Sequence, residues 1–378
     1  MRTIKWLAVW SWLIGTISSV FGTSYYFTKF GTPVVADDRI LFAGPGWESH
    51  RVICISKLDG KKLWEISDST NTLHPAFAFD QQVVITASSR IEQLNPKDGS
   101  RKTLFETGYS RPLLRPSTAD ILYCAGESSG SQKLKQINAR TWTPIWEIAG
   151  IERIIAEGEK TLLCGWQIRK PLGKDSFQIT ASGYAGIVKS SGKESWRQTM
   201  PSATWQHGVA VKEWFVVSLG DEVLCMRQEN GQILKRVKSP AGQPGVSLAN
   251  RGDHVVVWSC ADRASFSFAG RVYQLSVPEL DEFALFSTDF FPLSHAIFGD
   301  VVVGRSGGRV DAYSLTDGKK LWRDGQWNWS GVFDGAIYFS EQEPDGKHAS
   351  VNRIHIKTGE REKLYEELLR DPRQEDLK

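Results

Sequence analysis

The chain has 378 residues, and 46 basic and 43 acidic side chains give it a formal net charge of only +3 at pH 7. Nucleic-acid-binding proteins gather lysine and arginine on one face, whereas here both signs are interspersed, so we expect no nucleic-acid partner. The hydrophobic content of 41% is typical of a globular protein. The length exceeds one ordinary core unless the chain is a repeat array, which grows by addition.

The N-terminal segment predicts export from the cytoplasm. Arg2 and Lys5 supply positive charge, residues 6–21 form an uncharged and mostly apolar run, and Gly22 offers a small residue for cleavage. This layout is that of a secretory signal. We therefore expect residues 1–22 to be a signal peptide or a retained membrane anchor, and the protein to be periplasmic or extracellular. A cytoplasmic strand or helix is a third interpretation, and residues 6–21 are short for a full membrane span.

The five cysteines do not form a recognisable framework. Their number is odd and no Cys-x-x-Cys pair occurs, so neither a disulfide pattern nor a zinc site follows from their spacing. Cysteines in apolar runs are expected to be buried thiols that pack as small hydrophobic side chains. We predict no metal site.

A turn followed by a tryptophan recurs along the chain. The hexapeptide Asp-Gly-Lys-Lys-Leu-Trp occurs at residues 59–64 and again at residues 317–322. Weaker copies of this unit lie at residues 98–99, 140–146, 191–196, 230–234, 278–281 and 358–360. Eight copies between Gly60 and Gly359 give a period of about 43 residues, which is within the range of propeller blades.

Each repeat contains four short runs rich in Val, Ile, Leu, Phe and Tyr and bounded by Gly, Asp, Asn or Pro, which predicts strands and hairpins. In the fifth repeat these runs are residues 207–211, 214–219, 222–227 and 232–237. Four strands repeated eight times predict an all-β fold. We expect an eight-bladed β-propeller of four-stranded antiparallel blades over residues 23–366.

The repeated unit has a physical role in such a blade. Glycine in the turn between the third and fourth strands allows a positive φ without a Cβ clash. The aromatic side chain a few residues later is wide enough to fill the wedge between neighbouring blades. We therefore predict that these tryptophans are structural blade anchors: Trp64, Trp146, Trp196 and Trp322.

Closure of the propeller requires a strand that protects the open edges of the first and last blades. Tyr25–Phe30 has the alternation of an outer strand, and we expect it to close the ring. The competing closing strand is Glu362–Tyr365. We expect a short helix or a frayed tail over Glu360–Arg370, because its leucines have helical spacing, and a polar C-terminal tail over residues 367–378.

The units at residues 59–64, 191–196 and 317–322 resemble the tryptophan-docking repeat of pyrroloquinoline quinone (PQQ)-type propellers, and the resemblance extends over residues 25–366. It implies the propeller fold and two functional groups. Quinoprotein dehydrogenases bind PQQ with calcium and usually carry an adjacent cysteine pair, which this chain lacks. The other group is non-catalytic and is similar to the propeller subunit of the outer-membrane β-barrel assembly machinery, which binds a partner protein through its loops.

Size and blade count favour the second group. We expect a non-catalytic module that binds or scaffolds protein or peptide partners in the cell envelope through its loop faces, acts as a monomer and needs no cofactor. The alternative is a PQQ-dependent oxidoreductase or a propeller that binds a small ligand. We predict no catalytic residue, because no catalytic set appears at the expected loop positions.

Polar residues recur where each innermost strand begins, a position that faces the central channel of a propeller. Alignment of the repeats gives this set as Thr32, His74, Arg115, Arg153, His207, His295 and Ser330. Our hypothesis is a cationic channel mouth that binds an anion, such as a carboxylate or a quinone, through His74, Arg115, Arg153, His207 and His295. The alternative is that these residues are solvated and line a wet channel.

Overall fold

The structure is a computed structural model that describes most of the chain between residues 33 and 368. The described segments are 33–44, 50–68, 73–79, 82–109, 113–118, 120–128, 131–171, 177–200, 207–219, 222–238, 247–260, 269–289, 294–306, 309–325, 332–343 and 347–368.

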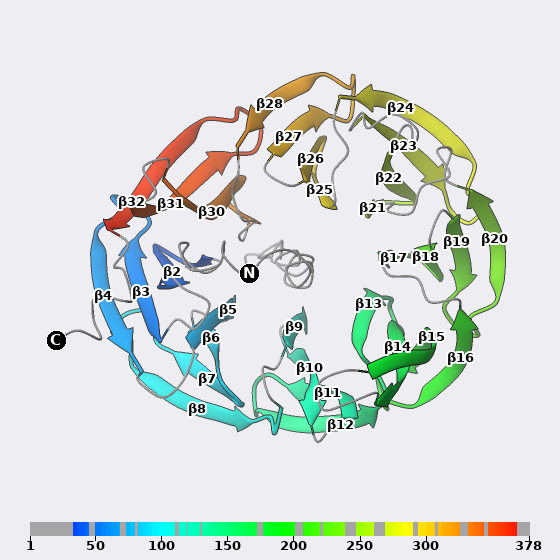
Figure 1. Ribbon diagram of the computed structural model, residues 1–378, viewed down its shortest axis with the longest axis horizontal. Coiled ribbons are helices and arrows are strands. Elements are labelled where there is room, and N and C mark those ends of the chain that lie inside the picture. The colour runs from blue at the N-terminus through cyan, green and yellow to red at the C-terminus, as the bar shows by residue number, and fades with distance from the viewer. Residues whose placement is uncertain are drawn as a thin grey trace, which may run out of the picture. The chain divides into compact units, whose positions relative to one another are not determined.

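These residues form 32 β-strands and no helix, and the strands are joined in eight four-stranded sheets (Figure 1). In every sheet the hydrogen-bonded order follows the chain order, so each blade is an antiparallel meander. The fold is therefore an all-β, eight-bladed β-propeller, as the sequence predicts. No helix of the described chain has the length and apolarity that a membrane crossing requires.

The chain divides into two compact units. The first comprises residues 1–124, 138–143 and 326–378. Three blades lie wholly within it. Their strands are β1 Val34–Ala36, β2 Arg39–Ala43, β3 Arg51–Ser56 and β4 Lys62–Ser67; β5 Leu73–Phe79, β6 Gln82–Ala87, β7 Arg90–Leu94 and β8 Arg101–Glu106; and β29 Val332–Phe333, β30 Ala336–Gln342, β31 His348–His355 and β32 Arg361–Leu368.

The second unit comprises residues 125–137 and 144–325. Four blades lie wholly within it. Their strands are β13 Arg153–Glu157, β14 Thr161–Pro171, β15 Phe177–Val188 and β16 Glu194–Met200; β17 Gly208–Val211, β18 Trp214–Leu219, β19 Glu222–Arg227 and β20 Ile233–Lys238; β21 Ser247–Arg251, β22 His254–Cys260, β23 Gly270–Ser276 and β24 Glu282–Thr288; and β25 Ser294–Phe298, β26 Val301–Ser306, β27 Arg309–Ser314 and β28 Lys320–Asp324.

The remaining blade has residues in both units. Its strands are β9 Leu113–Thr118, β10 Ile121–Ser128, β11 Ser131–Asn138 and β12 Thr143–Ala149. The strand bounds predicted for the fifth repeat agree with β17 to β20 within one residue at every end.

Within the first unit, the last blade packs directly on the first. A buried cluster joins Ile40 and Phe42 of β2 to Tyr338 of β30 and Leu364 of β32. At the surface, Arg51 bridges the same junction, because its two terminal nitrogens each lie 2.9 Å from a carboxylate oxygen, one of Glu65 and one of Glu367. Hydrophobic packing and two ion pairs of Arg51 thus connect segments from opposite ends of the chain.

The outermost strand of the last blade corrects one prediction. The helix or frayed tail expected over Glu360–Arg370 is wrong, because Arg361–Leu368 forms β32 and pairs antiparallel with β31. The helical spacing of the leucines does not correspond to one buried face, because Leu364 is buried in the blade junction whereas Leu368 is 57% exposed. The closing strand predicted at Tyr25–Phe30 lies outside the described residues.

The turn between the third and fourth strands has the same geometry in exact and degenerate copies of the repeat. The amide of Gly60 donates to the carbonyl oxygen of Ser56, 2.9 Å away, and φ of Gly60 is 69°. Trp142 and Leu280 occupy the equivalent position of two glycine-free copies, with φ of 58° and 54°. Non-glycine residues rarely adopt a positive φ, so the surrounding blade enforces this turn.

Candidate functional site

The tryptophans of the repeats hydrogen-bond to the turn of the following blade. The indole Nε1 of Trp64 donates to the carbonyl oxygen of Pro96 at 2.8 Å. Trp146 donates in the same way to the carbonyl of Lys189 at 2.8 Å, and Trp196 to that of Gln228 at 2.9 Å. Trp322, in β28, is 9% exposed. Each bond satisfies a largely buried indole donor, which leaves these rings little capacity to bind a ligand.

The turn glycines complete the same contact. A Cβ built on Gly192 would lie 2.5 Å from the ring of Trp146, and one on Gly231 would lie 2.6 Å from the ring of Trp196. Gly99 has the same relation to Trp64, at 3.2 Å. The tryptophan of one blade therefore lies flat against the glycine of the next.

Of the residues proposed for an anion site, the structure brings together those of the second unit. Arg153 begins β13, His207 directly precedes β17, and His295 lies in β25. Consecutive innermost strands of this unit contact each other, β13 with β17, β17 with β21 and β21 with β25 (Figure 1). Arg153 acts electrostatically on His207, and His207 on His295.

The other members of the predicted set are not joined to this group. Arg115 lies half-buried in β9, and the backbone of His74 lies in β5, both in the first unit. Thr32 and Ser330 lie outside the described residues. The prediction that all these residues face one channel stays a prediction.

Arg153 lies in a row of residues that crosses three strands of its blade. It pairs with Gly165 of β14, and Gly165 pairs with Tyr184 of β15. Directly paired residues project from the same face of a sheet, so the arginine and tyrosine side chains flank a position without a side chain. Arg153 uses this room, because its Nε lies 3.6 Å from the place that a Cβ of Gly165 would occupy.

Both flanking side chains carry polar atoms without partners. Tyr184 is completely buried, and its hydroxyl has no hydrogen-bond partner among the described residues. Within the same part of the chain, the buried Nε of Arg153 has none either, and Arg153 forms no ion pair there. Burial raises the pKa of Tyr184, and the nearby charge of Arg153 offsets part of that effect, so the phenol stays protonated and can donate a hydrogen bond.

His207 approaches this row from the neighbouring blade. A Cβ on the next residue, Gly208, would lie 2.6 Å from Cγ2 of Ile155, so β17 begins in direct contact with β13. Ser218 fixes the backbone of His207, since its amide donates to the His207 carbonyl at 2.9 Å and its hydroxyl accepts from the His207 amide at 3.1 Å. Burial, and then the charge of Arg153, lower the pKa of His207 to about 4. Its imidazole is therefore neutral at pH 7, and its buried Nδ1 has no described partner.

His295 continues the group towards the next blades. It is 3% exposed, and its ring lies 5.9 Å from the ring of Trp258. Burial, and then His207, lower the pKa of His295 to about 3, which a hydrogen bond with the Val256 backbone partly opposes. Two neutral histidines and one fixed cation thus lie along the inner strands of the second unit.

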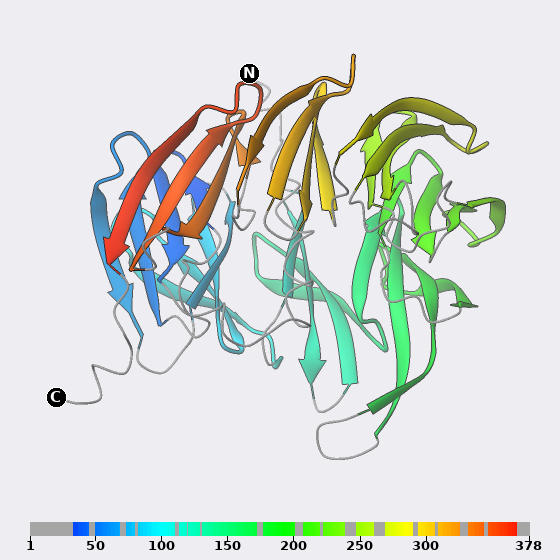
Figure 2. The same cartoon turned by 45° about the horizontal axis from the view of Figure 1, so that its top comes forward.

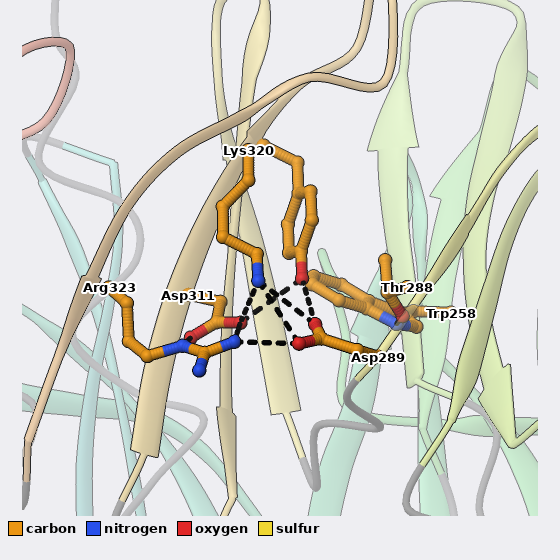
Figure 3. A network of polar contacts seen from close by, with 7 residues as sticks. Trp258, Thr288, Asp289, Asp311, Lys320 and Arg323 are labelled. Carbon is orange, nitrogen blue, oxygen red and sulfur yellow. Dashed lines mark hydrogen bonds and ion pairs between the residues drawn. The ribbon is translucent and has the colours of Figure 1, made fainter.

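A second polar group joins two blades near their outer strands (Figure 3). The hydroxyl of Tyr313 donates to Asp289 at 3.0 Å and to Asp311 at 3.1 Å. Arg323 binds the same two carboxylates, with Nε 3.1 Å from Asp311 and a terminal nitrogen 2.8 Å from Asp289. Lys320 adds contacts to Asp289 at 3.1 Å. Its charges are mutually compensated, so this network fits a structural role better than ligand binding.

The hairpin of β14 and β15 is the third distinctive feature, and sequence reasoning missed it. Its strands have 11 and 12 residues, and they extend beyond both neighbours (Figure 2). The pairing with β13 ends at Gly165, and that with β16 ends at Ser182. Beyond those points the hairpin is a two-stranded ribbon among the described strands, and it exposes Ile168 by 54% and Ile179 by 41%.

The described residues contain no group of three or more His, Cys, Asp or Glu side chains that could hold a metal ion. Four cysteines in this part of the chain are buried: Cys54, Cys124, Cys164 and Cys225. Burial raises the pKa of Cys54 and of Cys225 to about 12, so these thiols are unreactive at neutral pH. The expectation that the protein needs no cofactor, and its PQQ-dependent alternative, stay predictions.

The family comparison agrees with the repeat geometry. The family described as outer membrane protein assembly factor BamB, a PQQ-like repeat family, matches residues 181–327. This region includes the docked Trp196 and its acceptor blade. The chain is a β-propeller whose residues 181–327 match this PQQ-like repeat family. It is similar to BamB, as the resemblance in the repeat sequences implies. No curated protein sequence matches the chain.

Solved structures show the same fold at low sequence identity. BamB from Moraxella catarrhalis is 13% identical over 76% of this chain and 80% of its own, with a TM-score of 0.48. Sqt1 from Saccharomyces cerevisiae is 9% identical over 88% and 95%, with a TM-score of 0.52. A puromycin-hydrolyzing peptidase from Mycobacterium tuberculosis is 15% identical over 92% of this chain but only 55% of the peptidase, with a TM-score of 0.50. The likenesses to Sqt1 and to the peptidase, with TM-scores of 0.52 and 0.50, show the fold alone, and function has to be argued from the site itself.

Proposed function

We propose that this PQQ-like propeller is a non-catalytic protein-binding module of the cell envelope, and that the β14–β15 hairpin is its docking element. The observation that carries the proposal is the ribbon beyond Gly165 and Ser182, which combines strand edges that no other described strand pairs with and the exposed side chains of Ile168 and Ile179. The match of residues 181–327 to the family of the outer membrane protein assembly factor BamB supports the same class of function.

The chemistry of the ribbon specifies the kind of partner. An open strand edge offers backbone amides and carbonyls that an extended segment of another protein can pair with. The exposed isoleucines then supply apolar contacts, which backbone pairing alone lacks. Lys170 is also exposed on the ribbon, so it favours a partner segment with an acidic residue beside its apolar ones. The partner is therefore an extended, apolar and partly acidic protein strand.

Photo-crosslinking from the hairpin tests this proposal. A photoreactive amino acid at position 168 or 179, in the full chain expressed in its native cells, is expected to yield one defined protein adduct that mass spectrometry can identify. The purified partner should then bind the wild-type propeller, and the double substitution Ile168→Asp and Ile179→Asp should weaken that binding at least about tenfold, since it places charge in an apolar contact.

Leu234 provides a matched control, because it is 53% exposed on β20, an outer strand of the neighbouring blade. The same photoreactive residue at position 234 should give no such adduct. Equal labelling from positions 168 and 234, or an identified partner that binds the double variant as tightly as the wild type, would contradict docking through the hairpin.

A further inference from the structure

We propose that Arg153, Tyr184 and His207 form a binding site for the carboxylate group of a small molecule, at the junction between the β13–β16 blade and the β17–β20 blade. The site is independent of the hairpin and of the protein-binding function proposed above. It refines the anion hypothesis to three residues, one of which the alignment of repeats did not identify.

The first argument is the set of polar atoms left without partners. The buried Nε of Arg153, the hydroxyl of Tyr184 and the buried Nδ1 of His207 all lack a hydrogen-bond partner among the described residues. Buried polar atoms in native proteins are nearly always paired, and each exception requires an explanation. Three exceptions from neighbouring strands indicate that these atoms serve something other than the protein itself.

The second argument is geometric. Arg153 and Tyr184 both pair with Gly165, from its two sides, and they share one face of the sheet. That face packs against the next blade, because Tyr184 belongs to a buried cluster with Phe215 and Val217 of β18. His207 enters at the same blade junction through the contact of Gly208 with Ile155. The three side chains therefore converge from two blades.

The third argument is access. Arg153 and His207 are only partly buried, whereas Tyr184 is completely buried. A ligand can therefore reach the arginine from solvent and direct its acidic group inward, towards the phenol. Gly165 adds no side chain between the arginine and the tyrosine, and Cδ1 of Ile155 lies 3.3 Å from the place that a Cβ there would occupy.

The fourth argument is charge. Arg153 is the fixed cation of the group, and the depressed pKa of His207, about 4, keeps the imidazole neutral at pH 7. A single positive charge matches the single negative charge of a carboxylate and leaves a dianionic phosphate undercompensated. Guanidinium groups bind carboxylates with well-defined hydrogen bonds, and a phenol adds a further donor.

Calorimetry and thermal unfolding of the full chain at pH 7 test the site, with acetate, lactate and succinate as probes and with chloride and phosphate at matched ionic strength. We expect saturable binding of at least one carboxylate and a rise in melting temperature. Arg153→Leu should abolish both effects. Tyr184→Phe should weaken binding about tenfold, because it removes one hydrogen bond to a charged group.

Two controls make the result interpretable. Arg236→Leu removes an arginine of the same unit that already pairs with Glu222, at 3.3 Å, and it should leave carboxylate binding unchanged. Without ligand, Tyr184→Phe should melt at the same temperature as the wild type or higher, since the variant buries no unsatisfied hydroxyl. Arg153→Lys, which retains the charge but not the planar donor group, should bind more weakly than the wild type.

Several results would overturn the proposal. These are the absence of saturable binding by every carboxylate probe, equal binding of phosphate, or the same loss of binding in Arg236→Leu as in Arg153→Leu. A ligand-free Tyr184→Phe protein that melts well below the wild type would show that the hydroxyl already has a partner, such as a buried water, and would also reject the site.

Discussion

At the scale of single residues, the junction between blades depends on the absence of a side chain as much as on the presence of one. Trp146 hydrogen-bonds to the turn of the next blade and covers Gly192, and Trp196 covers Gly231 in the same way. The positive φ of these glycines favours glycine, and the aromatic ring beside them excludes a Cβ. Two requirements thus act on the same position.

Gly192→Ala separates these two requirements when it is compared with Gly252→Ala. Both glycines have similar φ, 67° and 62°, but a Cβ at 192 would meet the Trp146 ring at 2.5 Å, whereas one at 252 has nothing within 4 Å. We expect Gly252→Ala to lower the free energy of unfolding by about 1 kcal/mol, the cost of backbone strain. Gly192→Ala should cost about 1–3 kcal/mol more, because the ring must move. Chemical denaturation measures both, and equal losses would show that only the backbone matters.

The polar atoms at Arg153 and Tyr184 show where residue-level prediction failed. The alignment of repeats identified Arg153 and His207, because both lie where an innermost strand begins. It could not identify Tyr184, which reads as an ordinary apolar residue of a third strand. Only the pairing of Arg153 and Tyr184 with the same glycine makes the tyrosine a candidate ligand-binding residue.

At the scale of elements, a blade can pack against a neighbour on each of its faces, as the β17–β20 and β21–β24 blades do, so a polar residue in a strand can be buried on either face. Asp311 alternates with Val310 and Ala312 in β27, a pattern that predicts a solvent-facing carboxylate. The structure buries Asp311 completely, where Tyr313 and Arg323 donate hydrogen bonds to it. Strand alternation assigns side chains to two faces but does not reveal which face meets a neighbouring blade.

Asp311→Ala tests the weight of this network. We expect the free energy of unfolding to fall by about 3 kcal/mol, because the substitution removes the completely buried carboxylate and leaves Tyr313 and Arg323 paired with the largely exposed Asp289. Asp289→Ala is the matched control, since Asp289 belongs to the same network but its side chain is 57% exposed, and it should cost less than about 1 kcal/mol. Denaturant titration of the two variants under identical conditions gives the comparison, and a larger loss for Asp289→Ala would refute the assignment.

The two element-level departures from prediction have a common cause. β32 was expected to be a helix because leucine spacing was read without its partner strand, and the length of the β14–β15 hairpin was not anticipated because its end forms no regular repeat. In contrast, β18 and β19 were predicted to the residue, since turn residues bound them on both sides. Turn residues that bound a strand can be recognised in the sequence, whereas the strand with which a segment pairs cannot.

At the scale of the whole molecule, the architecture was predictable because it repeats. Eight occurrences of one turn set the strand order of eight sheets, and this information did not depend on any single copy. The specific site was not predictable in the same way, because the aligned register that contains Arg153 and His207 does not include Tyr184, which lies in a third strand. The repeated turn thus predicts the fold, whereas the proposed site depends on residues that the repeat alone does not identify.

The buried histidines predict a loss of global stability in mild acid. The folded-state pKa values of His207 and His295, about 4 and about 3, lie below the ordinary value near 6.5. The unfolded chain therefore binds more protons as pH falls, so stability is complete above pH 6.5 and is lost progressively towards pH 3–4. At pH 5 we expect His295 alone to account for a loss of about 2 kcal/mol relative to pH 7.

Denaturant unfolding at pH 7 and at pH 5 measures this loss. In His295→Gln the difference between the two pH values should shrink by that amount, while His355→Gln, at an exposed position of β31, should retain the wild-type difference. If His295→Gln shows the same difference in unfolding free energy between pH 7 and pH 5 as the wild type, the acid sensitivity belongs to other groups, such as His207.

The contact between the tryptophan of one blade and the turn of the next also has an evolutionary meaning. Pro96, Lys189 and Gln228 differ in side chain, yet each presents only a backbone carbonyl to the incoming indole. The acceptor of each indole is thus a backbone carbonyl, a group that every residue has whatever its side chain. A duplicated or transplanted blade would find a compatible neighbour on arrival, so such a chain can diversify by shuffling whole blades while individual loops and strand faces acquire new binding roles.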